Sequence, residues 1–245
     1  MLDSKGIITH YNPKSPVSEA YRVLRTNILF SSFDKPIKTM VVTSAGSGEG
    51  KSTTIVNLAV TFAQQGSKVL LIDADLRKPR IHRIMMMDNS NGLTNLLSTH
   101  NDYRDYIRSS RINNLDVLLC GAIPPNPSEL LMSNVMKQFI QKVRGDYDII
   151  LLDAPPAISV TDAAIISTYV DGTILVAASG TVEKEALIGA KEVLNKVKAN
   201  ILGVVLNKID RKTTGNYHYY EYYYYGDTEN THKKKKHDID PSKIT

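Results

Sequence analysis

The residues Ala45-Gly46-Ser47-Gly48-Glu49-Gly50-Lys51-Ser52-Thr53 match the phosphate-binding pattern G-x-x-x-x-G-K-[ST], except that Ala45 stands where the pattern has its first glycine. An apolar run that ends at Thr43 precedes the match, and apolar residues at helical spacing as far as Phe62 follow it. The pattern binds phosphate in this context of strand, loop and helix, because glycines admit close backbone N–H groups and a helix N-terminus favours negative charge. The segment therefore predicts a nucleotide site.

The residues of this loop have distinct expected parts in holding a nucleotide. The Lys51 ammonium can bridge the β- and γ-phosphates, and the Ser52 hydroxyl can bind Mg²⁺. We expect the nucleotide phosphates to lie against Gly46, Ser47, Gly48, Glu49, Gly50, Lys51, Ser52 and Thr53.

Short runs rich in Val, Ile and Leu alternate with longer helical stretches along the chain. The runs occupy residues 39–43, 69–73, 115–119, 148–153, 173–177 and 201–207. They are apolar throughout rather than alternating, which is typical of parallel strands covered by helices on both faces. The sequence therefore predicts an α/β fold of the P-loop NTPase type, a doubly wound and mostly parallel sheet flanked by helices.

The chain divides into three expected segments. Residues 1–35 form an N-terminal segment whose helix begins at Ser15-Pro16, an N-cap followed by the first helical residue, and runs to about Ser31. Residues 36–210 form the phosphate-loop domain. Residues 211–245 replace apolar periodicity with tyrosines and a lysine run, so we expect a flexible, disordered tail.

Composition excludes several classes of protein. With 42% hydrophobic residues among 245, the chain can build a sizeable core, and it is neither disordered throughout nor fibrous. No apolar run approaches the ~18 residues of a membrane span, and the N-terminus lacks the apolar region of a signal peptide. The single cysteine, Cys120, fits a reducing compartment, so we expect a cytoplasmic protein. A net charge of +5 permits anionic partners but does not require a nucleic acid.

Two predicted strands end in aspartates. One continues as Asp73-Ala74-Asp75-Leu76-Arg77, and the other as Asp153-Ala154-Pro155-Pro156, where Asp153 has the form of a Walker B metal-binding acid. Parallel strands deliver their C-terminal residues to one edge of the sheet, where ligands bind. We therefore expect Asp73, Asp75 and Asp153 to lie beside the phosphate loop.

These motifs together resemble those of the bacterial protein-tyrosine kinases of capsule and exopolysaccharide biosynthesis, which use a P-loop ATPase fold. The matching features are the phosphate loop, the D-x-D-x-R segment at Asp73, the D-A-P-P segment at Asp153, the segment P-P-N-P-S-E-L-L at 124–131 and a terminal tyrosine cluster. The resemblance covers nearly the whole chain. It implies an ATP:protein-tyrosine phosphotransferase that uses ATP and Mg²⁺.

The resemblance also implies catalytic roles for Lys51, Asp73, Asp75 and Asp153. Lys51 and Ser52 would hold phosphate and Mg²⁺, Asp75 and Asp153 would hold the metal directly or through water, and Asp73 would accept the proton of the incoming tyrosine. A tyrosine hydroxyl has a pKa of ~10 and an ordinary aspartate one of ~3.9. Because the transition state of phosphoryl transfer is loose, we expect Asp73 to orient the tyrosine as much as to deprotonate it.

Seven of the 13 tyrosines fall within nine residues of the tail. Autophosphorylation explains this cluster, because many hydroxyls on one tether offer acceptors at high local concentration. The alternatives are an aggregation-prone low-complexity segment or an aromatic platform for nucleic acid. The expected acceptors are Tyr217, Tyr219, Tyr220, Tyr222, Tyr223, Tyr224 and Tyr225.

Glu19, Arg22 and Arg25 form the pattern E-x-x-R-x-x-R on one face of the N-terminal helix. Spacing alone also allows a solvated helix with an i,i+3 ion pair. The resemblance implies an oligomerisation motif that builds a homo-oligomeric ring, with phosphate transfer in trans. It further implies protein substrates, a separate membrane activator of polysaccharide co-polymerase type that recruits the kinase peripherally to the membrane, and a cognate phosphotyrosine phosphatase.

Two other nucleotide-dependent classes share some of these features. A partition-type or Min-type ATPase would assemble on DNA or membrane, but such proteins usually carry a lysine where this chain has Gly46. Residues Asn207-Lys208-Ile209-Asp210 spell the guanine-reading N-K-x-D of GTPases, whereas D-x-P-P at Asp153 replaces the D-x-x-G of a regulatory GTPase. We therefore expect ATP, with Asn207 among the nucleotide-binding residues.

Overall fold

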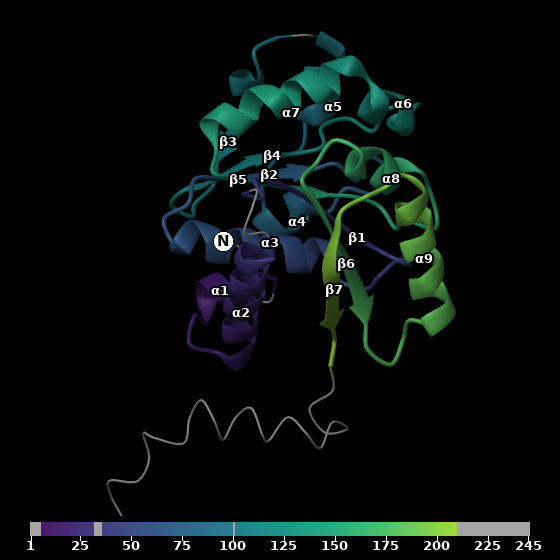
Figure 1. Cartoon of the computed structure of the whole chain (residues 1–245). Helices are drawn as coiled ribbons and strands as arrows, with labels where there is room; N and C mark the ends of the chain where they lie inside the picture. The colour runs from purple at the N-terminus through teal and green to yellow at the C-terminus, as the bar shows by residue number, and fades with distance from the viewer. Residues whose placement is uncertain (1–5, 32–35, 100, 210–245) are drawn as a thin grey trace, which may run out of the picture. The chain divides into compact units, whose positions relative to one another are not determined.

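A mostly parallel sheet forms the centre of the structure (Figure 1). The computed structural model describes residues 6–31, 36–99 and 101–209, so the predicted tail and its tyrosine cluster lie outside the described residues. Within the described ranges the sheet has seven strands in the order β3-β4-β2-β5-β1-β6-β7, and every pairing is parallel except that of β3 with β4. The strands are β1 (Thr39–Ser44), β2 (Val69–Asp73), β3 (Arg108–Ser109), β4 (Leu115–Leu118), β5 (Ile149–Asp153), β6 (Gly172–Ala178) and β7 (Ile201–Asn207).

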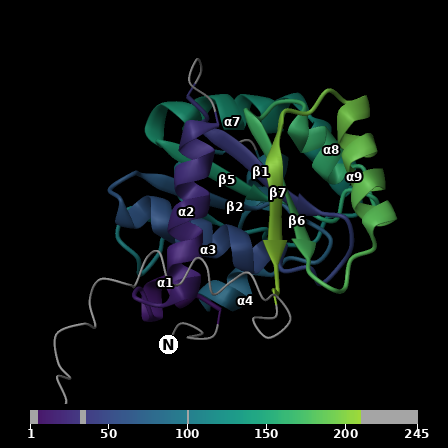
Figure 2. The same cartoon turned by 60° about the horizontal axis from the view of Figure 1, so that its bottom comes forward.

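Helices cover both faces of the sheet and enclose two apolar layers (Figures 1 and 2). Leu151 of β5 faces α3 and α4, whereas Ile150 and Leu152 face the layer formed with α5 to α9. The predicted doubly wound architecture is thus confirmed. The helices are α1 (Ile8–Tyr11), α2 (Pro16–Phe30), α3 (Lys51–Gln64), α4 (Ile81–Met85), α5 (Leu93–Thr99), the 3-10 turn η1 (Tyr103–Asp105), α6 (Pro127–Met132), α7 (Asn134–Asp146), α8 (Asp162–Ser167) and α9 (Lys184–Lys196).

All six predicted strands are present, but β7 departs from the expected environment. Every residue of β1, β2, β5 and β6 is buried, as fully covered parallel strands require. In β7 the side chains of Val204 and Leu206 are 52% and 54% exposed. The expectation of cover on both faces is wrong for this strand, which among the described residues is the last in the sheet order and pairs with β6 alone.

The N-terminal helix begins as the sequence predicts. The Ser15 hydroxyl accepts a hydrogen bond from the Ser18 N–H, and Pro16 is the first helical residue of α2. The helix packs against α3 through Ile28, and α1 docks on the same helix through a 2.9 Å hydrogen bond from the Thr9 hydroxyl to Asn57 Oδ1. One compact unit runs as far as Lys208. The segment boundaries near residues 35 and 210 stay a prediction.

None of the helices in the described part is long and apolar enough to cross a membrane. Cys120 is free and buried, and burial raises the pKa of its thiol to about 12.

Candidate active site

The phosphate loop connects β1 to α3 and takes its shape from two left-handed glycines. Gly48 has φ +79°, and Gly50, the N-cap of α3, has φ +95°. A Cβ atom at Gly50 would lie 2.1 Å from Asn207 Nδ2, which no real contact tolerates. Glycine is therefore required at position 50 both by its backbone conformation and by the close approach of β7.

The Glu49 side chain stabilises this loop by hydrogen bonds from inside it. It is buried, and its carboxylate accepts hydrogen bonds from the Gly46 N–H and, at 3.3 Å, from the Ala178 N–H at the end of β6. The Gly46 N–H, expected to face a phosphate, thus bonds to a carboxylate of its own loop. The outer side of the loop is held by Asn207 Nδ2, which donates to the Glu49 carbonyl at 2.9 Å, and by Lys208 Nζ, which donates to the Gly48 carbonyl at 2.7 Å.

The three predicted aspartates converge beside the loop. Asp73 and Asp153 are register partners at the ends of the neighbouring strands β2 and β5, and both are fully buried. Asp75 is 3% exposed, and its Oδ2 lies 2.9 Å from Lys51 Nζ. Burial alone would lower the pKa of Lys51, but the charges of Asp153 and Asp75 outweigh it and raise this pKa. Lys51 thus stays a cation among carboxylates.

Asp73 is held by the chain that follows it. Its Oδ2 accepts the N–H groups of Arg80 and Ile81 at 3.1 and 3.0 Å, whereas Oδ1 is buried without a hydrogen-bond partner among the described residues. Burial, followed by the charge of Asp153, raises the pKa of Asp73 well above its ordinary value. Asp73 is therefore a stronger base than an exposed aspartate.

The carboxylate of Asp153 is the group in the site best suited to bind a metal ion. Both of its oxygens are buried, and neither makes a well-formed hydrogen bond in the described part of the chain. Burial raises the pKa of Asp153 to about 6, although the charge of Lys51 and the nearby Ser52 hydroxyl act to lower it. Orphaned carboxylate oxygens near the Ser52 hydroxyl suit Mg²⁺, a hard cation that takes oxygen ligands and keeps several waters. Over the described ranges, no group of three or more His, Cys, Asp or Glu side chains is arranged to hold a metal ion by itself. The donor set thus fits a Mg²⁺ ion that also draws ligands from phosphate and water.

Arg77 joins two of the motif segments to the start of α8. Its Nε lies 2.8 Å from Asp162 Oδ2, and its Nη2 donates to Asp162 Oδ1 at 3.0 Å and to Ser128 Oγ at 2.9 Å. Ser128 Oγ in turn donates to Asp162 Oδ1 at 2.7 Å. Sequence reasoning included Arg77 and Ser128 in separate motifs but missed Asp162, which belongs to the helix after the D-A-P-P segment.

The residues expected to mediate oligomerisation make contacts inside the chain. Arg22 Nη1 lies 2.7 Å from Glu19 Oε2 on the exposed side of α2. Arg25 Nη1 donates at 2.8 Å to the Thr61 carbonyl of α3. The ion pair is the one that spacing alone allows, and the role of these residues between copies stays a prediction.

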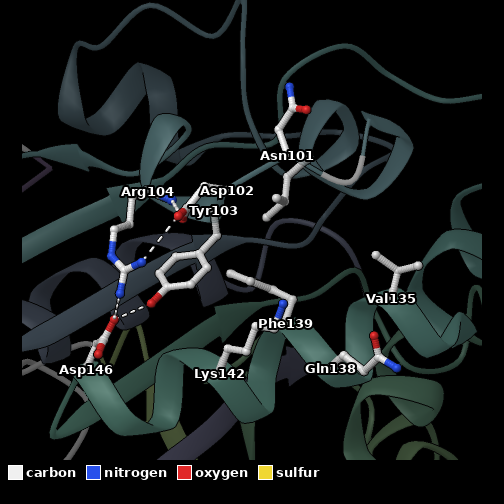
Figure 3. A pocket seen from close by; sticks show the side chains of 10 residues that line it. Asn101, Asp102, Tyr103, Arg104, Val135, Gln138, Phe139, Lys142 and Asp146 are labelled. Atoms are coloured by element: carbon white, nitrogen blue, oxygen red, sulfur yellow. Dashed lines mark hydrogen bonds and ion pairs between the residues drawn. The ribbon is translucent and has the colours of Figure 1, made fainter.

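A separate cavity of about 590 Å³ lies between η1 and α7 (Figure 3). Arg104 lines the cavity, with Nη2 3.3 Å from Asp146 Oδ2, and the ring centroids of Tyr103 and Phe139 are 6.0 Å apart. None of the residues that line this cavity belongs to the phosphate loop or to the aspartate cluster.

Known proteins share both the sequence and the fold of this chain. Residues 36–240 match the ParA family, described as the NUBPL iron-transfer P-loop NTPase. The tyrosine-protein kinase YwqD of Bacillus subtilis is 47% identical over 203 residues, which cover 83% of this chain and 86% of YwqD. This chain belongs to the bacterial tyrosine-protein kinases. Its nucleotide-binding fold is that of a ParA-type P-loop NTPase.

Other relatives give the same assignment. The putative tyrosine-protein kinase CapB of Staphylococcus aureus is 40% identical, over 87% of this chain and 93% of CapB. The crystal structure of the chimerical protein CapA2B2 superposes with a TM-score of 0.82 at 39% identity, over 86% of this chain and 93% of that one. The septum site-determining protein MinD of Pyrococcus horikoshii, complexed with Mg-ADP, reaches a TM-score of 0.59 at 26% identity. The likeness to the Min-type ATPase is thus the weaker of the two.

Proposed function

We propose that this kinase transfers the γ-phosphoryl group of ATP, with Mg²⁺, to the tyrosines at 217–225 of its own tail. The observation that carries the proposal is Asp153, whose two buried oxygens lack hydrogen-bond partners beside the Lys51–Asp75 pair and the phosphate loop. Such a constellation suits phosphoryl transfer, in which the protein positions the reactants and neutralises charge.

Each residue of the site has a proposed part. Residues 46–53 hold the phosphates, and Lys51 neutralises their charge. Ser52, Asp75 and Asp153 hold Mg²⁺ directly or through water; the ion, when bound, would neutralise charge on the phosphates. Asp73 orients the tyrosine hydroxyl and accepts its proton, a role favoured by its raised pKa. Because Asp73 is fully buried, the acceptor meets it only when the residues that cover it move aside.

Transfer in trans follows from the proposed ring. Glu19, Arg22 and Arg25 would contact a neighbouring copy, so the tail of one subunit would enter the site of the next. A phosphorylated cluster would carry about −1.5 to −2 charges per tyrosine and repel itself. We propose that an unmodified tail supports the ring and a phosphorylated tail breaks it, which the oligomer mass before and after phosphorylation tests.

The cellular part of the proposal rests on the family. We propose that the kinase regulates capsular or exopolysaccharide synthesis and export, that a separate membrane protein of polysaccharide co-polymerase type activates it and brings it to the membrane from the cytoplasm, and that a phosphotyrosine phosphatase reverses its action. Measuring the kinase activity with and without the cytoplasmic segment of such an activator tests the partnership.

Phosphotyrosine formation tests the proposed reaction. The wild type, Lys51→Met and a chain that ends at Gly215 are incubated with ATP and Mg²⁺, and phosphotyrosine is mapped by mass spectrometry. We expect phosphate on Tyr217 to Tyr225 of the wild type and none on Lys51→Met. ATP hydrolysis without phosphotyrosine would instead favour the partition-type or Min-type ATPase, and a clear preference for GTP in a competition assay would contradict the kinase assignment.

A further inference from the structure

Lys208 directly follows β7, and its side chain reaches the phosphate loop. Its Nζ donates a 2.7 Å hydrogen bond to the carbonyl of Gly48. The backbone of Lys208 has φ +56°, in the left-handed region that residues with a Cβ atom rarely adopt. Lys208 therefore has an unfavourable backbone conformation at the position from which its ammonium group binds the phosphate loop.

Asn207, the residue before Lys208, binds the carbonyl of the next loop residue, Glu49. Asn207 Nδ2 donates to the carbonyl of Glu49 at 2.9 Å, and the Asn207 carbonyl accepts the Ser179 N–H at 2.8 Å. Two consecutive carbonyls of the loop are thus bound by two consecutive side chains at the end of β7. Because β7 pairs with β6, these contacts tie the loop to the edge of the sheet.

This arrangement sets the direction of two N–H groups. A peptide unit is planar, and its C=O and the following N–H point in opposite directions. Lys208, by holding the Gly48 carbonyl, turns the N–H of Glu49 away from β7. Asn207, by holding the Glu49 carbonyl, does the same for the N–H of Gly50. Backbone N–H groups of a phosphate loop are the groups that bind phosphate.

Charge gives Lys208 a second effect on the same loop. The Glu49 carboxylate is buried within the loop, where it would repel a bound phosphate. An ammonium that bonds to the carbonyl of the preceding residue offsets part of this repulsion.

We propose that Lys208 is a positioning residue of the nucleotide site, which fixes the phosphate loop in the shape that binds phosphate. The inference rests on the proposed function, in which this loop holds the phosphates of ATP. Lys208 stands nine residues before the first tyrosine of the cluster. The N-K pair at 207–208 then serves the loop whichever base the nucleotide carries.

Nucleotide affinity of the full-length chain tests this role. The dissociation constant of ADP with Mg²⁺ is measured by calorimetry for the wild type, Lys208→Met, Lys208→Arg and Lys198→Met. We expect Lys208→Met to bind about 3- to 10-fold more weakly, because it loses a charge-assisted hydrogen bond, and Lys208→Arg to recover part of the loss. Lys198 is the matched control, since it is also exposed, has φ +57° and lies in the turn after α9.

Hydrogen exchange of the nucleotide-free chain gives a second readout that a general loss of stability would not mimic. We expect amides of residues 46–50 to exchange faster in Lys208→Met, with α2 and β2 unchanged. Equal affinity and equal exchange in Lys208→Met and the wild type would overturn the inference. These two readouts decide the role of Lys208 whether or not phosphotyrosine forms, whereas phosphotyrosine mapping decides the proposed function.

Discussion

Arg77 and Asp162 form a bidentate ion pair, with Nε 2.8 Å from Oδ2 and Nη2 3.0 Å from Oδ1. Asp162 is fully buried, whereas the Arg77 side chain is 36% exposed. Ser128 completes the network from the start of α6. This pair links the segment that carries Asp73 and Asp75 to the segment that follows Asp153, so it stabilises the relative placement of the aspartates.

Arg77→Met will destabilise the fold. The substitution leaves the Asp162 carboxylate buried with Ser128 as its remaining side-chain partner, and removing one partner of such a pair costs about 3 kcal/mol. Urea unfolding measures the loss. Arg104→Met is the matched control, because its side chain is 65% exposed and surface pairs contribute less than about 1 kcal/mol. Equal losses in the two variants would contradict the buried role of Asp162.

Asp153→Asn will stabilise the protein while it removes activity. Burial raises the pKa of Asp153 to about 6, so its charge is costly to the folded state at neutral pH. The uncharged amide should raise the free energy of unfolding by on the order of 2 kcal/mol at pH 7.5. Mg²⁺-dependent phosphotyrosine formation should fall by more than about 100-fold, because the site loses a metal ligand. A variant that is less stable than the wild type would contradict this account of Asp153.

The difference in stability between Asp153→Asn and the wild type should depend on pH in one direction only. Between the ordinary pKa of 3.8 and the folded value of about 6, the folded chain binds more protons at Asp153 than the unfolded chain does. The Asp153 contribution to stability therefore falls as pH rises through this window. The advantage of Asp153→Asn should be complete above about pH 6 and vanish below about pH 4, as thermal unfolding at a series of pH values will show. An advantage that stays constant with pH would contradict the raised pKa.

Gly50→Ala will weaken nucleotide binding. Its Cβ atom would lie 2.1 Å from Asn207 Nδ2 at φ +95°, so the Asn207 side chain must move away and lose its hydrogen bond to the Glu49 carbonyl. Gly66→Ala is the control, since φ is +100° there and no atom lies within 4 Å of the new Cβ. Both variants should lose about 1 kcal/mol of stability from backbone strain, but calorimetry should find weaker nucleotide binding in Gly50→Ala alone. Undiminished binding by Gly50→Ala would show that this close approach does not matter.

The proposed interface of α2 can be separated from its intrachain packing. Glu19→Ala with Arg22→Ala removes an exposed ion pair and an exposed hydrogen bond from Arg22 to the Pro13 carbonyl, and should change stability by no more than about 1 kcal/mol. Arg25→Ala also removes the hydrogen bond to the Thr61 carbonyl, so its effect on assembly mixes with an effect on the fold. Light scattering should find a smaller oligomer for the double variant. An unchanged oligomer mass would contradict the ring.

The sequence predicts local features of this protein far better than long-range contacts. Continuous apolar runs identified six strands, and the aspartates at two strand ends met as predicted because parallel strands share an edge. β3 was not predicted, because a strand of two residues is too short to show a periodic pattern. The pairing of Arg77 with Asp162 spans 85 residues, and no local pattern encodes it. The exposure of β7 likewise depends on its place in the strand order, which apolar composition does not specify.

Glu49 and Lys208 illustrate the same limit within the site. The phosphate-loop pattern leaves the residue at position 49 undefined, so it does not predict a carboxylate that holds the loop from inside. Lys208 belongs to a four-residue pattern known from guanine recognition, yet its side chain contacts the loop itself. Both contacts depend on the tertiary approach of β6 and β7 to the loop.

Phosphate transfer between copies tests the central claim most directly. An active chain that ends at Gly215, and so lacks Tyr217 to Tyr225, is mixed with full-length Asp153→Asn in ATP and Mg²⁺. Asp153→Asn is preferable to Lys51→Met as the acceptor, because it keeps the Lys51–Asp75 ion pair intact. The account predicts phosphotyrosine at 217–225 of the inactive chain in the mixture and none when that chain is incubated alone. An acceptor tail without phosphate, under conditions in which the wild type labels itself, would contradict transfer from the Lys51 site of one copy to the tail of another.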